Sequence, residues 1–244
     1  MVRSNTTFYR AVGTMIGGIV GVGVFGLPYA FAQSGFVLGL AELLGMAALV
    51  TLFQLMYAEV AIQTEGKHRL PGYIRRYLGK YWSMFSLIAL SLMLWGAMVA
   101  FTIVGGQFWY VLFSPMFGGS EVLYSVLLAL AGSALMYRGL RFVSRMEVGI
   151  IITLLFLFTF IVLASLPHLT AANLTAIVWS DAFVPYGVIL FALAGLGVVP
   201  ELKDVLGARQ AHRLPHVIVV GMCIVTVLYA AFAFAVVGAT GAQT

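Results

Sequence analysis

A glycine-rich stretch near the start of the chain has the residue types of a backbone binding site. Residues 17–28 read GGIVGVGVFGLP and lie in the middle of an apolar segment over 9–33. Each glycine costs a helix interior about 1 kcal/mol relative to alanine, and Pro28 lacks the N–H that a regular helix requires. We therefore expect the helix to break here and leave backbone N–H and C=O groups unpaired.

A second interruption lies in the middle of the apolar segment 182–206. It consists of Ala194, Gly195, Leu196 and Gly197, and a proline follows three residues later. Inside a bilayer, unpaired backbone groups are tolerated only where they line a protein cavity. The two interruptions are therefore candidate walls of one binding site.

The two kinds of helix end would favour opposite charges. The half-helices expected to begin near Val24 and Gly197 present free N–H groups and a positive dipole end, which suit a carboxylate. The half-helices expected to end at residues 20 and 193 present free carbonyl groups, which suit a sodium ion or an amine. For the first stretch, close packing of Gly13, Gly17 and Gly21 at a spacing of four is the rival interpretation.

The composition indicates an all-α integral membrane protein. The 244 residues are 62% hydrophobic and 9% charged, whereas a typical soluble domain has about 25% charged residues. The formal net charge is +5, but the basic residues lie between apolar segments. We therefore expect a lipid bilayer, and no nucleic acid, as the surrounding partner.

Seven apolar segments are long enough to read as spanning helices. They cover 9–33, 36–62, 83–112, 121–137, 146–166, 182–206 and 214–238. Every lysine and arginine, Arg138, Arg141 and Arg145 among them, lies near the start of the first segment or near or beyond the end of the second, fourth or sixth. The positive-inside rule then places the protein in the cytoplasmic membrane, with the N-terminus in the cytoplasm and the C-terminus outside.

With this orientation, the first and sixth segments cross the membrane in opposite directions. Paired interruptions in two such segments are typical of transporters built from inverted repeats. Close packing of glycines does not account for the second interruption at the same depth.

Three short stretches carry a family resemblance: GGIVGVGVFGLPY at 17–29, FALAG at 191–195 and PEL at 200–202. They resemble the first and sixth spans of amino-acid permeases of the amino acid–polyamine–organocation superfamily, especially the aromatic amino acid and amino acid/auxin branches. The resemblance implies a leucine-transporter-like fold, with two inverted five-helix repeats and with helices one and six discontinuous. In the single transporter domain 1–244, it implies a first repeat over 1–170 and the start of a second over 171–244. Since the family has ten or more spans, a chain with seven would be truncated.

The resemblance also implies where ligands bind. It places the substrate carboxylate near Gly21, Val22 and Gly23. Val24, where the outer half-helix of span one is expected to begin, is a further candidate substrate-binding residue. It places the amino group and side chain near Ala194, Gly195, Leu196 and Gly197. The carbonyl groups of Gly17 and Val20 would join a cation site in sodium-coupled relatives.

Four other polar residues inside the apolar segments are candidates for a functional or structural role. Glu42 suits either proton coupling or a hydrogen-bonded structural role, and Glu59 suits a gate or interface. Gln54 and Gln107 are expected to form interhelical hydrogen bonds. No residue spacing indicates a metal site, a cofactor or a catalytic triad, so we expect no enzyme and only H⁺ or Na⁺ as a coupling ion.

The leading hypothesis is a secondary active transporter that moves an amino acid by alternating access. The likeness to aromatic permeases favours tryptophan or tyrosine as the substrate. A non-transporting truncated permease is the alternative. A seven-helix sensory receptor or retinal protein is less favoured. A receptor normally has its N-terminus outside, and a retinal protein needs a lysine inside a span, whereas Lys67, Lys80 and Lys203 all lie at segment ends. The sequence leaves the oligomeric state and the direction of transport open.

Overall fold

A computed structural model describes residues 2–137 and 140–241, and in this part of the chain all regular structure is helical. The chain divides into two compact units, one of Met1–Tyr77 with Leu157–Thr244 and one of Leu78–Phe156. Both glycine-rich interruptions belong to the first unit. Arg138 lies outside the described residues, as do the side chains of Arg141 and Arg145.

The first unit contains the long helices that surround the interruptions. They are α1 (Val2–Ile19), η1 (Val22–Phe25), α2 (Gly26–Ser34), α3 (Phe36–Gln63), α4 (Leu70–Leu78), α9 (Val184–Ala192), η4 (Leu196–Val198), α10 (Val199–Leu206) and α11 (Leu214–Thr240). Short elements join them: η2 (Leu166–His168), α8 (Ala171–Thr175), η3 (Trp179–Asp181) and η5 (Ala208–Arg213). Helix α7 (Leu140–Ser165) crosses the boundary between the units.

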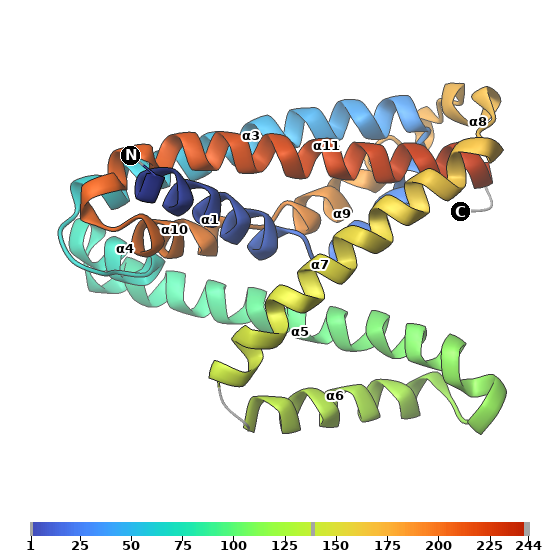
Figure 1. Cartoon of the computed structure of the whole chain (residues 1–244), viewed down its shortest axis with the longest axis horizontal. Helices are drawn as coiled ribbons and strands as arrows, with labels where there is room; N and C mark the ends of the chain where they lie inside the picture. Colours follow the sequence, from blue (N-terminus) through green and yellow to red (C-terminus); the bar gives the residue numbers. More distant parts are fainter. Residues whose placement is uncertain (1, 138–139, 242–244) are drawn as a thin grey trace. The chain divides into compact units, whose positions relative to one another are not determined.

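Helix α11 forms the centre of this unit. It runs beside α3 and also packs on α1 and α2 (Figure 1). Its buried residues recur every three or four positions, as in Ile218, Met222 and Val225, which is the pattern of one helical face turned to a core. Gly221 allows the close approach to α1, since a Cβ atom there would lie 2.5 Å from the Cγ atom of Met15.

The first interruption separates α1 from η1 and α2. Helix α1 ends at Ile19, and Gly21 has an extended backbone before η1 begins at Val22. The helical parts before and after this break are bent by 58°. The interruption lies inside the glycine-rich stretch that the sequence singles out.

The second interruption separates α9 from α10. Helix α9 ends at Ala192, the short η4 turn follows Gly195, and α10 starts at Val199. The proline that follows occupies the first turn of α10, where its missing N–H costs nothing.

Within residues 2–137 and 140–241, four helical stretches are long and apolar enough to cross a membrane, or five when the bent pair is counted as one. They are Phe36–Gln63, Lys80–Phe117, Val184–Leu206 and Ala208–Thr240, with Thr6–Ile19 and Val22–Ser34 as the bent pair. Two shorter apolar helices cover Glu121–Tyr137 and Ile152–His168. These apolar helices confirm the prediction of an all-α integral membrane protein, while the count of seven crossings stays a prediction.

The second unit is organised around two antiparallel helices, α5 (Lys80–Phe117) and α6 (Glu121–Tyr137). Their connection is tied by the Tyr124 hydroxyl, which donates to the Gly118 carbonyl at 2.8 Å. Helix α5 is longer at both ends than the predicted segment 83–112, because it ends at glycines with positive φ, Gly79 and Gly118. Gln107 is exposed on α5.

Candidate functional site

The two interruptions meet in the first unit. A Cβ atom on Gly23 would lie 2.8 Å from the Cα atom of Ala192, at the end of α9. A Cβ atom on Gly195 would lie 2.6 Å from Cγ1 of Ile19, at the end of α1. Only glycine allows such backbone contact. We call this meeting place, residues 19–23 with 192–197, the junction.

Six residues of the junction have backbone N–H groups that donate to no backbone carbonyl within the described chain. They are Gly21, Val22, Gly23, Gly195, Leu196 and Gly197. Each group of three leads into a helical turn, where the first N–H groups are unpaired and the dipole end is positive. The junction therefore offers two sets of hydrogen-bond donors that suit an anionic group.

The junction residues differ in exposure. Gly21, Val22 and Gly23 are half-buried, and Val24 is buried. In the second interruption Gly195 is buried, whereas Ala194, Leu196 and Gly197 are exposed. The structure thus brings the predicted substrate-binding residues of both interruptions into one region.

The carbonyl ends of the two half-helices share one side chain, Tyr229. Its hydroxyl group lies 3.2 Å from the carbonyl oxygen of Ile19 and 3.0 Å from that of Ala192. These are the last residues of α1 and α9, and Tyr229 is fully buried in α11. The two carbonyl ends thus share a single hydroxyl donor, and cation binding at these helix ends stays a prediction.

Gln54 of α3 also reaches the junction. Its side chain is 0% exposed, and its Nε2 atom lies 3.1 Å from the position of a Cβ atom on Gly195. Neither Nε2 nor Oε1 has a hydrogen-bond partner. The interhelical hydrogen bond predicted for Gln54 is therefore not formed, and the amide stays an unsatisfied polar group at the junction.

The remaining predicted site residues lie apart from the junction or are untested. Glu42 precedes Gln54 by 12 residues in α3, which is about 18 Å along a helix axis. Its Oε2 atom is buried and unpartnered. Glu59 is exposed near the end of α3 and accepts a hydrogen bond from Gln63. Coupling through Gly17, Val20 or Glu42 stays a prediction.

Helix α10 is fixed to the end of α3 by Lys203. Its Nζ atom donates to the carbonyl oxygens of Ala61 at 2.7 Å, Thr64 at 2.8 Å and Gly66 at 3.3 Å. The carbonyls of Ala61 and Thr64 lie at the negative end of α3, where a cation is favourable, and that of Gly66 lies in the loop that follows. Lys203, which the sequence places at the end of a predicted segment, thus caps the end of the neighbouring helix α3.

Two exposed ion pairs flank this cap. Lys67 and Asp204 approach to 3.6 Å, and Arg69 and Glu201 to 3.8 Å. Nearby, the ring of Tyr73 packs edge-on against Tyr57 and His68, and burial raises the pKa of the Tyr73 phenol.

We expect Lys203→Met to lower the free energy of unfolding by about 1–3 kcal/mol, because three carbonyls lose a charged donor. Lys67→Met removes the same charge from an exposed ion pair, which is worth about 0–1 kcal/mol. Thermal unfolding of both variants in detergent measures the difference. Equal unfolding temperatures would contradict the role of Lys203 as a cap.

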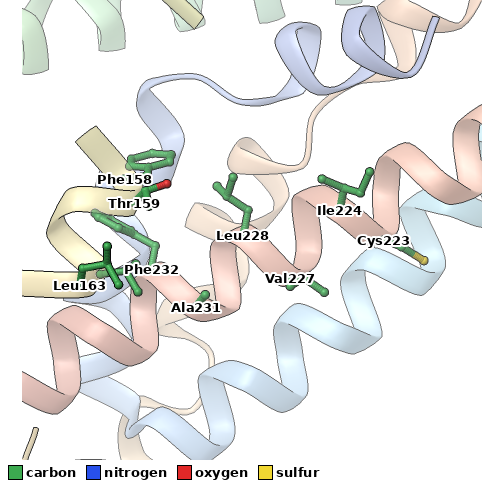
Figure 2. A pocket seen from close by; sticks show the side chains of 10 residues that line it. Phe158, Thr159, Leu163, Cys223, Ile224, Val227, Leu228, Ala231 and Phe232 are labelled. Atoms are coloured by element: carbon green, nitrogen blue, oxygen red, sulfur yellow. The ribbon is translucent and has the colours of Figure 1, made fainter. Parts of the chain in front are cut away.

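An open groove of the first unit lies elsewhere, between α7 and α11 (Figure 2). It has a volume of about 500 Å³, and most of its lining is apolar, with Phe158, Leu163 and Val227 as examples. Thr159 and Cys223 supply its few polar atoms. The groove offers little to hold a charged amino acid and contains none of the predicted site residues.

No metal site emerges from the side chains that the structure describes, where no three histidine, cysteine, aspartate or glutamate residues are grouped to hold an ion. Among known families, the profile of the tryptophan/tyrosine permease family matches residues 5–244. No curated protein matches the sequence significantly. The family match covers both interruptions and supports the predicted resemblance to aromatic amino acid permeases. The chain therefore belongs to the tryptophan/tyrosine permease family.

Proposed function

We propose that this protein is a secondary active transporter that carries tryptophan or tyrosine across the cytoplasmic membrane by alternating access, driven by a gradient of H⁺ or Na⁺. Membership of the family implies amino acid transport across a membrane. The observation that carries the finer proposal is the junction, where two interrupted helices meet and present unpaired N–H groups. Unpaired backbone groups at mid-helix are what transporters use to hold substrates.

In this proposal, the junction binds the amino acid through its backbone. The N–H groups of Gly21, Val22 and Gly23 donate to the carboxylate, helped by the positive end of the following helix. The amino group and the aromatic side chain lie along residues 194–197. The glycines keep both backbones close enough to contact one small molecule.

The proposed architecture has seven crossings arranged as a first repeat and part of an inverted second one. The cluster of Lys67, Arg69 and Lys203 at one end of the first unit supports a cytoplasmic location for that end. Helices α1 and α10 would then lie in the inner half of the membrane. The proposed orientation has the N-terminus in the cytoplasm.

Transport by the purified chain in liposomes tests the proposal. We expect radiolabelled tryptophan to accumulate when an inward H⁺ or Na⁺ gradient is imposed, and to leak out when an ionophore collapses that gradient. The gradient that drives accumulation identifies the coupling ion. Tryptophan binding without accumulation would favour the non-transporting alternative. The absence of both binding and accumulation would overturn the proposal entirely.

A further inference from the structure

We propose that Gln54 is a substrate-binding residue, whose side-chain amide donates to the carboxylate of the bound amino acid and accepts from its ammonium group. This inference rests on the proposed function and adds a side chain to a site otherwise made of backbone. Three observations support the inference: α3 directs the amide into the junction, the amide has no hydrogen-bond partner, and the unpaired groups of the junction are mostly N–H donors.

Helix α3 directs Gln54 inward. Its buried residues include Val50, Gln54, Ala58 and Ala61, which are spaced by three or four and so share one helical face. At Gln54 this face meets Gly195, against which the Ile19 side chain also packs. The amide therefore lies where the ends of both interrupted helices come together.

The amide at this position has no partner of its own. A side-chain amide has two N–H donors and a carbonyl acceptor, and burying them unsatisfied destabilises a protein. In the folded chain neither end of the Gln54 amide is hydrogen-bonded. The amide approaches Gly195, which belongs to the junction with its six unpaired N–H groups. A buried polar group that the fold does not use at such a place is more consistent with a ligand contact than with a structural one.

The unpaired groups of the junction favour a ligand that carries both a carboxylate and an ammonium group. The nearest carbonyl ends, those of Ile19 and Ala192, are already contacted by the Tyr229 hydroxyl. What remains unpaired is a set of N–H donors and one amide. An α-amino acid in its zwitterionic form matches this set, because its carboxylate accepts from N–H groups while its ammonium needs an acceptor such as Oε1.

Gly195 is part of the same arrangement. A Cβ atom there would meet both Nε2 of Gln54, at 3.1 Å, and the Ile19 side chain. Glycine at this position lets the amide approach the backbone of the second interruption closely.

Binding to the purified full chain tests the inference, with three probes measured by calorimetry. L-tryptophan carries both charged groups, tryptamine lacks the carboxylate, and indole-3-propionate lacks the ammonium. We expect Gln54→Leu to weaken tryptophan binding roughly 10- to 100-fold, as for loss of hydrogen bonds to charged groups. The preference for tryptophan over both analogues should shrink in the same variant.

Stability separates a ligand contact from a structural one. Replacing an unsatisfied buried amide by an apolar group of similar size is expected to leave the ligand-free unfolding temperature unchanged or raise it. Gln54→Met serves as a second variant that follows the glutamine shape more closely. Gln63→Leu, the same substitution at the exposed end of α3, should change neither affinity nor preference.

The outcomes are distinct. Wild-type affinity and preference in Gln54→Leu and Gln54→Met would overturn the inference. The inference would also be overturned if the variants bind all three probes equally more weakly and unfold at a lower temperature. That result would show that Gln54 has a structural role, either directly or through an ordered water molecule. If the unaltered chain binds no tryptophan, the proposed function fails before any variant is compared.

Discussion

Gly23→Leu is expected to abolish gradient-driven tryptophan uptake by the reconstituted protein. A Cβ atom on residue 23 would lie 2.8 Å from the Ala192 Cα atom and 3.1 Å from the Phe191 ring, so the backbones of the two interruptions must separate. Overpacking of this kind costs about 1–3 kcal/mol, and the unpaired N–H groups of the junction would be displaced as well. Gly23→Ala should lower uptake roughly tenfold for the same reason.

Two other glycines provide matched controls for this experiment. Gly13→Leu places the same side chain on exposed α1, where nothing lies within 4 Å of an added Cβ atom. Gly187→Leu does the same on α9, where Gly187 is exposed and an added Cβ atom also has nothing within 4 Å. Both controls should retain most of the uptake. Full uptake by Gly23→Leu, or equal loss in Gly13→Leu, would contradict the close junction as the transport site.

Tyr229→Phe should lower the free energy of unfolding by about 1–3 kcal/mol, the cost of leaving buried acceptors without a donor. The substitution keeps the ring and removes only the hydroxyl that contacts the Ile19 and Ala192 carbonyls. Because these carbonyls end α1 and α9, both interrupted helices lose a fixed end. Thermal unfolding in detergent measures the stability, and tryptophan uptake measures the effect on the junction.

Tyr29→Phe is the control for the loss of a phenolic hydroxyl. Tyr29 lies on α2 and is 55% exposed, so its substitution should leave the unfolding temperature within the error of the measurement. If Tyr229→Phe unfolds at the same temperature as Tyr29→Phe, the Tyr229 hydroxyl stabilises neither helix end.

The positions of the two interruptions could be predicted from the sequence because they depend on local chemistry. Glycine and proline lower helix propensity wherever they stand, so residues 17–28 and 194–197 mark weak points without knowledge of their neighbours. That the chain is an integral membrane protein could also be predicted directly, from its high content of hydrophobic residues and low content of charged ones. The family resemblance rested on these same residues, and the match over residues 5–244 supports its aromatic permease branch.

The side chains that complete the junction could not be predicted in the same way. Tyr229 contacts carbonyls that are 210 and 37 residues away in the chain, and nothing in its own segment distinguishes it from other buried aromatic residues. Gln54 did stand out as a polar residue in an apolar segment. Whether its amide has a partner depends on the packing of α3 against two other segments, which periodicity does not specify.

The Tyr229 hydroxyl carries one proton but faces two acceptors, so it can donate to only one carbonyl at a time. If the ends of α1 and α9 move apart, the hydroxyl can follow either one and keep its hydrogen bond. When the two helix ends separate, one carbonyl loses its contact but the hydroxyl keeps a hydrogen bond to the other. The separation therefore costs less free energy than breaking a buried hydrogen bond in which both groups lose their partner. The phenol can therefore keep a hydrogen bond to one half-helix when the other moves away.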